Sequence, residues 1–229
     1  GMSLFWSNTY WGGEKFYNKE SIAAIKNKFG ASLVRVAMGV EDDWGYLDQP
    51  KQNEQRVITA VDAAIANDLY VIIDWHSHNA QDYEAEAIAF FKKMARKYGQ
   101  HNNVIYEIYN EPVGASWSRD IKPYAEAVIK EIRKIDPDNL IIVGTPNWSQ
   151  KVTDAANNPI TQYKNIAYTL HFYAATPSHQ QALRDEALRA MRKNIAIFVT
   201  EWGTVEYTGN GKFSAKESDK WVRFMKKHN

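Results

Sequence analysis

The sequence predicts a parallel (β/α)8-type barrel. Seven apolar runs of strand length alternate with helical segments along the 229 residues, and the order begins with a strand. No linker, low-complexity segment or block of charge interrupts the alternation, so residues 1–229 are expected to form one domain. A regular alternation of this length favours a barrel, and a doubly wound sheet is the alternative.

The expected strands are runs with almost continuous apolar character, which is typical of strands buried on both faces. They are Met2 to Trp6, Leu33 to Met38, Tyr70 to Trp75, Val104 to Tyr109, Leu140 to Gly144, Ile166 to Tyr173 and Ala196 to Trp202. The next-to-last and last runs are the longest, and polar residues follow most of the runs directly.

The helical segments show apolar residues repeating every 3.6 positions. In the second of them Val57, Val61 and Ala64 fall on one face, as expected for a helix that covers a sheet. Gly30 and Gly99 mark helix ends. The segments are Glu20 to Phe29, Glu54 to Asn67, Tyr83 to Tyr98, Ile121 to Ile135, a short one near Val152 to Ala156, Gln180 to Lys193 and Ala215 to Lys227.

Seven strands are one fewer than a closed (β/α)8 barrel requires. No apolar run follows the last helical segment, and the sequence starts inside the first strand run. We therefore expect a C-terminally truncated domain that lacks the eighth strand and the lead-in to strand one. A variant barrel that closes differently is the alternative.

Composition excludes several classes of function. The formal net charge of +1 and a pI near 8.0 do not favour binding to nucleic acid or to an anionic membrane. The absence of cysteine excludes disulfides, thiolate metal sites and cysteine nucleophiles. No run approaches the roughly 18 apolar residues of a membrane span. With 13% aromatic residues, the chain is suited to a neutral polymer as its partner.

Two glutamates follow buried strand runs at the point where each strand ends. Glu111 lies in VIYEIYNEP and Glu201 in AIFVTEWG. The carboxyl ends of the strands meet at one end of a parallel barrel, where such barrels place their chemistry. One such glutamate alone is usually a salt-bridged surface residue. Two that converge are the acid/base and nucleophile that a retaining glycoside hydrolase needs.

Other polar and aromatic residues lie at the same strand ends. We expect Arg35 and the Tyr173 hydroxyl to lower the pKa of Glu201, and burial beside that carboxylate to raise the pKa of Glu111. Asn110 is placed to bind a sugar 2-hydroxyl. The full set collected from the strand ends is Arg35, His76, Asn110, Trp148, His171 and Tyr173.

Each of these residues alone is also compatible with a structural role. Arg35 could be a core ion-pair partner, a single histidine is more often structural than catalytic, and Trp6 and Trp148 could be packing aromatics. His76 and His78 alternate in HSH without a further cluster at metal-ligand spacing, so we interpret His78 as a loop residue. We expect no metal and no cofactor.

Seven segments carry a resemblance to a known family. They read GMSLFW, LVRVAMG, VIIDWHSH, NVIYEIYNEP, IKPYAEAVIKEIRKIDPDNLIIVGTPNWSQ, AYTLHFYA and IFVTEWGT. These segments resemble the catalytic domain of glycoside hydrolase family 5 endoglucanases (cellulases) of the type found in bacteria and plant-parasitic nematodes. The resemblance extends over the whole chain, so residues 1–229 are expected to be a single glycoside hydrolase catalytic domain.

The resemblance implies that Glu111 is the acid/base and Glu201 the nucleophile. It implies a surrounding polar shell formed by Arg35, His76, Asn110, His171 and Tyr173, and sugar-stacking positions at Trp6 and Trp148. The family's eighth strand brings a further stacking tryptophan, which is absent here. Trp221 is expected to pack against the sheet instead.

The implied function is that of a secreted, retaining endo-β-1,4-glucanase that cleaves cellulose or related β-glucans through a covalent glycosyl-enzyme intermediate. A carbohydrate-binding module elsewhere in the natural polypeptide is compatible with this. Two alternatives remain open: a non-catalytic or weakly active β-glucan-binding fragment of a barrel, and a β-mannanase that uses the same pair of carboxylates.

Overall fold

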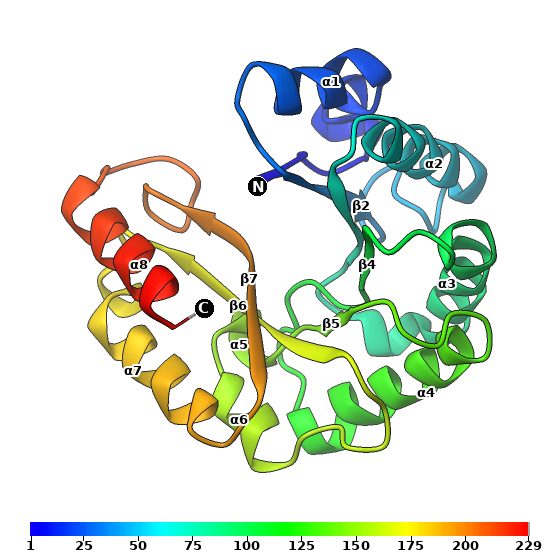
Figure 1. Cartoon of the computed structure of the whole chain (residues 1–229). Helices are drawn as coiled ribbons and strands as arrows, with labels where there is room; N and C mark the ends of the chain where they lie inside the picture. The colour runs from blue at the N-terminus through cyan, green and yellow to red at the C-terminus, as the bar shows by residue number, and fades with distance from the viewer. Residues whose placement is uncertain (229) are drawn as a thin grey trace.

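A single parallel sheet of seven strands forms the centre of the molecule (Figure 1). The computed structural model describes residues 1–228. The strands are β1 (Met2–Ser3), β2 (Leu33–Gly39), β3 (Tyr70–His76), β4 (Val104–Glu107), β5 (Ile141–Val143), β6 (Ile166–Tyr173) and β7 (Ala196–Gly203). Each strand pairs with the next one along the chain, which confirms the predicted barrel type and excludes the doubly wound alternative, in which the strand order reverses.

Helices surround the curved sheet on its outer side (Figure 1). They are α1 (Lys19–Asn27), α2 (Pro50–Ala66), α3 (Glu84–Tyr98), α4 (Lys122–Arg133), α5 (Pro146–Ser149), α6 (Val152–Asn157), α7 (Gln181–Met191) and α8 (Ala215–Lys227), with short 3-10 or π turns η1 (Thr9–Trp11), η2 (Glu14–Phe16), η3 (Ala80–Tyr83), η4 (Trp117–Ile121) and η5 (Pro177–His179). The α2 helix starts earlier than predicted because the fixed φ of proline suits a first helical turn. Of the helices in residues 1–228, none is long and apolar enough to span a membrane.

The two edges of the sheet are β1 and β7, which are not paired with each other in the described residues. Figure 1 shows them on either side of an opening in the ring of helices, between α8 and α1. The β1 strand is shorter than predicted, although Leu4 N still donates to Arg35 O (2.8 Å) and Ser7 N to Ala37 O (3.1 Å). The predicted β4 and β5 runs also extend beyond the regular strands.

The interior of the barrel is layered. Side chains two residues apart on a strand share a face, so Ile72 lies below Asp74 on β3 and Ile105 below Glu107 on β4. The lower layer is an apolar cluster of buried residues from neighbouring strands, comprising Ile72, Ile105, Ile142 and Ala167. The layer above it, toward the carboxyl ends of the strands, is charged and equally buried. The apolar layer therefore lies directly beneath the charged layer that forms the site.

The outer face of β6 and β7 is covered by α7 and α8. Trp221 on α8 is fully buried, stacks on Phe172 with ring centroids 3.9 Å apart and donates from Nε1 to His179 O over 2.8 Å. Arg184 lies over the same indole ring. These contacts confirm that Trp221 packs against the sheet and is not a residue of the cleft.

We expect Trp221→Ala to lower the free energy of unfolding by about 3–5 kcal/mol, because it leaves a large cavity against Phe172 and an unpaired carbonyl at His179. Chemical denaturation measures this. The matched control is Trp202→Ala, since Trp202 stacks on the same Phe172 but is 40% exposed. Equal losses for the two variants would contradict the packing described here.

Candidate active site

The two glutamates singled out from the sequence lie together at the carboxyl end of the barrel. Glu201 is in β7, and Glu111 follows β4 by four residues. One oxygen of each carboxylate and one ring nitrogen of His171 lie within 4.8 Å of one another. A retaining pair stands about 5–5.5 Å apart and an inverting pair about 6.5–9.5 Å apart, so this arrangement fits the retaining geometry.

Arg35 is the third residue of β2 (Leu33–Gly39), nearer the start of the strand than the carboxyl end where it was predicted. It is the shared partner of the carboxylates in the charged layer. Its side chain is 1% exposed. It forms ion pairs with Asp74 (2.9 Å), Glu107 (2.6 Å) and Glu201 (3.0 Å), and its guanidinium also donates to Asn110 Oδ1 (2.6 Å). Burial lowers the pKa of Arg35, but the three carboxylates outweigh burial and raise it, so the guanidinium stays charged.

Glu201 is held by Arg35 and by Tyr173, whose hydroxyl donates to Oε1 over 2.5 Å. Burial raises the pKa of Glu201, but the positive charges of His171 and Arg35 outweigh it, so the pKa lies below its ordinary value. The predicted direction is confirmed, with His171 as a further cause. Burial and the Glu201 charge raise the pKa of Tyr173, so its phenol stays protonated and remains a donor.

Glu111 has two histidine partners. His171 Nδ1 lies 2.8 Å from its Oε1, and His78 Nε2 lies 3.3 Å from its Oε2. Burial raises the pKa of Glu111, but these hydrogen bonds outweigh it and lower the pKa below its ordinary value. The predicted rise is therefore wrong, because it counted burial and Glu201 but neither histidine. The same contacts raise the pKa of both His171 and His78.

An irregularity between β6 and β7 delivers two adjacent residues of β7 to the site. Thr169 pairs with Phe198, whereas His171 pairs with Glu201, so β7 contains one extra residue between these pairs. In a regular strand Thr200 and Glu201 would point to opposite faces. The bulge turns both toward the barrel interior, where Thr200 contacts His171 and Glu201 contacts Arg35.

The β1 and β3 side of the site contains further residues predicted from the sequence. His76 Nδ1 lies 2.6 Å from Asp74 Oδ2, and its Nε2 lies 3.4 Å from Asn110 Nδ2. The Trp6 ring packs against the His76 ring at 4.7 Å and against the His78 ring at 5.9 Å. The structure thus brings Trp6, His76 and Asn110 together beside the glutamates.

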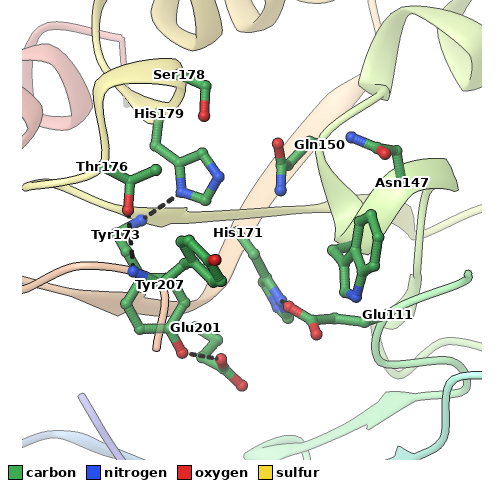
Figure 2. Close-up of a pocket in the computed structure, with 11 residues that line it drawn as sticks. Glu111, Asn147, Gln150, His171, Tyr173, Thr176, Ser178, His179, Glu201 and Tyr207 are labelled. Carbon is green, nitrogen blue, oxygen red and sulfur yellow. Dashed lines mark hydrogen bonds and ion pairs between the residues drawn. The ribbon is translucent and has the colours of Figure 1, made fainter. Parts of the chain in front are cut away.

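A cavity of about 660 Å³ opens beside Glu111 and Glu201. Figure 2 shows both carboxylates at one end of this cavity, with side chains of the loops after β5, β6 and β7 around it. Its size and mixed lining are typical of a small-ligand site. It is lined by Glu111, Asn147, Trp148, Gln150, His171, Tyr173, Thr176, Ser178, His179, Glu201 and Tyr207.

Trp148 reaches the cavity from a strained turn in α5. Asn147, Trp148 and Ser149 have φ values of 58°, 54° and 56°, which are left-handed and cost roughly 1–2 kcal/mol per residue. Ser149 Oγ donates to Asn110 O over 2.7 Å, and Trp148 N donates to Pro112 O over 3.2 Å. These bonds hold a half-exposed indole over the site, an arrangement that packing alone does not require.

Several residues of the site were not identified from the sequence. The alternation in HSH could have indicated His78, since residues two apart share a face of a strand. A charged residue inside an apolar run could have indicated Asp74 in VIIDW and Glu107 in VIYE. No sequence signal indicates His179 or Tyr207, because both come from loops whose path depends on the fold.

Glu111, His171 and Glu201 are residue types that also bind divalent metals. Both ring nitrogens of His171 already have partners, Glu111 on one side and the Thr200 hydroxyl on the other. Metal binding here would break the contact between His171 and one of these partners. The absence of a metal stays a prediction.

Comparison with known proteins identifies the family of the chain. The family model described as cellulase (glycosyl hydrolase family 5) matches residues 1–229. Endoglucanase Z of Dickeya dadantii is 59% identical over 229 residues, which are 100% of this chain and 53% of that protein. An endoglucanase of Clostridium saccharobutylicum is 49% identical over 218 residues, covering 93% of this chain and 48% of that protein. The chain thus spans about half the length of these curated relatives.

Among solved structures, the catalytic domain of Thermobifida fusca endoglucanase Cel5A superposes with a TM-score of 0.91 at 34% identity, over 99% of this chain and 75% of that one. The fold and the sequence thus point to the same family. The chain therefore belongs to the glycosyl hydrolase family 5 cellulases.

Proposed function

We propose that the protein is a retaining endo-β-1,4-glucanase. The observation that carries the proposal is the approach of the Glu111 and Glu201 carboxylates to within 4.8 Å at the carboxyl end of the barrel. That separation leaves no room for a water molecule between one carboxylate and the sugar, as an inverting mechanism requires. The relatives named above are endoglucanases, which supports the same reaction.

In this proposal Glu201 is the nucleophile and Glu111 the acid/base. Glu201 is ionised because Arg35 and His171 lower its pKa, so it can attack the anomeric carbon. Glu111 gives a proton to the leaving oxygen and then, as a carboxylate, takes a proton from the water that hydrolyses the glycosyl-enzyme. The Tyr173 hydroxyl stays on Glu201 and fixes its orientation.

The proposed substrate is a β-1,4-glucan. Trp148 and Tyr207 present exposed rings along the cavity, which suits stacking on sugar faces. A variant of the Thermobifida fusca Cel5A catalytic domain, 35% identical to this chain with a TM-score of 0.90, was solved in complex with cellotetraose. We also propose that the protein is secreted, because an insoluble polymer has to be met outside the cell. A carbohydrate-binding module elsewhere in the natural polypeptide is a further part of the proposal. Trp6, His76 and Asn110 are proposed to contact the sugar next to Glu201.

Proton NMR of cello-oligosaccharide hydrolysis tests the reaction. We expect the β-anomer to form first and to equilibrate slowly, because two displacements retain the configuration. Initial formation of the α-anomer would contradict the mechanism. Viscosity loss of carboxymethyl-cellulose, measured alongside binding to it, separates hydrolysis from mere binding. A parallel assay on mannan tests the β-mannanase alternative. Only faster cleavage of mannan than of β-glucan would support that alternative.

A further inference from the structure

A chain of hydrogen bonds runs from Glu111 into the closed interior of the barrel. His171 Nδ1 lies 2.8 Å from Glu111 Oε1, and His171 Nε2 lies 2.8 Å from the Thr200 hydroxyl oxygen. Thr200 donates to Glu107 Oε1 over 2.6 Å. His171 is 1% exposed and Glu107 fully buried, so bulk water does not compete for these atoms. The proton positions along this chain therefore depend on one another.

The surroundings of Glu107 determine which group donates in each hydrogen bond of this series. Arg35 Nε donates to Oε2 over 2.6 Å, and the Thr169 hydroxyl lies 3.4 Å from Oε1. Burial raises the pKa of Glu107, and the Arg35 guanidinium opposes that rise. A carboxyl group surrounded by donors is suited to accept on both oxygens. The single hydroxyl proton of Thr200 then points to Glu107, and its oxygen accepts from His171.

We propose that Thr200 is a positioning residue that keeps a proton on Nε2 of His171, so that Nδ1 can exchange one proton with Glu111. In one form the imidazolium donates from Nδ1 to ionised Glu111. In the other form that proton has moved to Glu111 Oε1, leaving a neutral imidazole and a carboxylic acid. The pair is neutral overall in both forms, no other bond changes, and Nε2–H continues to donate to Thr200.

This inference rests on the proposed function, because it explains how Glu111 obtains a proton although its pKa is lowered. With the proton on Nε2, a neutral His171 can only accept at Nδ1, which requires Glu111 to be the acid. With the opposite tautomer, His171 could only donate and would hold Glu111 as a carboxylate. The hydroxyl of Thr200 therefore makes the acid form accessible.

The remaining charged and titratable groups around the pair come from several elements. Glu201 on β7 and Arg35 on β2 act on His171, and Glu107 on β4 lies 4.0 Å from its Nε2. His78 and His76, at the end of β3, act on Glu111. None of these groups contacts His171 Nε2 within hydrogen-bond distance among the described residues, where Thr200 is its partner. The bulge in β7 is what places Thr200 there.

Nitrogen-15 NMR of histidine-labelled protein tests the tautomer directly. Chemical shifts distinguish protonated from bare ring nitrogens, and His171→Gln identifies the His171 signals by their loss. We expect that raising the pH removes the Nδ1 proton and leaves the Nε2 proton in place. Loss of the Nε2 proton instead would overturn the proposal, because Nδ1 would then be the permanent donor.

Thr200→Val removes the hydroxyl while keeping the branched shape. We expect the Nδ1-protonated tautomer to predominate in this variant and the basic limb of kcat/KM to move down by about 0.7 pH unit, the equivalent of one lost hydrogen bond. Thr200→Ser should restore both readouts. The matched control is Thr169→Val, which removes the other hydroxyl on Glu107 Oε1. Thr169 is not a hydrogen-bond partner of the His171 ring in the described residues, so this variant should keep the wild-type imidazole spectrum.

Identical spectra and pH profiles for Thr200→Val and Thr169→Val would overturn the assignment of Thr200. Should Thr200→Val fail to fold, the wild-type tautomer still tests the proposal, because the proposal requires Nε2 of His171 to keep its proton. The NMR readout does not depend on turnover. Protein that cleaves no glucan but keeps Nε2 protonated would therefore contradict the proposed function alone, whereas active protein with Nδ1 protonated would contradict the role of Thr200 alone.

Discussion

Glu201→Gln is expected to lower kcat on β-glucans by on the order of 10⁴-fold or more, because the amide cannot attack the anomeric carbon. The substitution preserves shape. The amide oxygen can still accept from Arg35, and the amide NH2 can donate to the Tyr173 hydroxyl oxygen, so the fold should persist. Thermal denaturation checks folding, and steady-state kinetics on carboxymethyl-cellulose measure the loss.

Glu111→Gln is expected to behave differently. An aryl glycoside with a good leaving group needs no acid in the first step, so glycosylation of this substrate should be largely spared while natural glucans are cleaved slowly. Hydrolysis of the intermediate should slow, because the general base is also lost. Burst kinetics with an activated aryl cellobioside separate the two steps.

Glu206→Gln is the matched control for both variants, since Glu206 lies in the loop after β7 and does not line the cavity. It should retain activity within about twofold, as is usual for surface changes of a fraction of a kcal/mol. Full loss of aryl glycoside cleavage in Glu111→Gln would contradict its role as the acid. Appreciable glucan turnover by Glu201→Gln would contradict its role as the nucleophile.

Arg35→Met is expected to lower the free energy of unfolding by about 3–5 kcal/mol, because it leaves buried carboxylates without their shared counter-charge. Asp74 and Glu107 are fully buried, and Glu201 is largely so. The substitution also removes a cause of the lowered pKa of Glu201, which weakens the nucleophile. Urea denaturation and the acidic limb of the pH profile measure the two effects.

The pH dependence of this loss has a definite sign. Without Arg35, burial raises the pKa of Glu107 and Glu201 in the folded protein above the unfolded values. The instability is then fully present at high pH and decreases as the pH falls through the raised pKa values. The difference from wild type should therefore be larger near about pH 8 than near about pH 5.

Arg56→Met is the control for Arg35→Met. Arg56 lies on α2 and donates to Ser7 O and Thr9 Oγ1, both of which are uncharged acceptors. Its loss should cost about 1 kcal/mol with little dependence on pH, as for an ordinary hydrogen bond. Equal losses for the two arginine variants would contradict the role of Arg35 as the common partner of the three carboxylates.

The alternation of apolar runs and amphipathic segments was enough to predict the parallel sheet and its outer helices, because burial on both faces leaves a continuous apolar signal. The predicted ends of β1, β4 and β5 lie beyond the observed strand ends, because apolar residues continue into the loops that follow these strands. The positions of Glu111 and Glu201 near strand ends were also predictable, because a charge cannot stay in an apolar layer without a partner.

Contacts between residues distant in the sequence were decided only by the tertiary structure. Glu111 has a lowered pKa because His171, which lies 60 residues further along the chain, and His78 converge on it. Thr200 and Glu201 share one side of β7 because of a bulge that no residue pattern in the sequence predicts. The type and the order of the secondary-structure elements follow from local hydrophobicity. Proton positions depend on distances of 2.6–2.8 Å that only the closed packing of several strands can set.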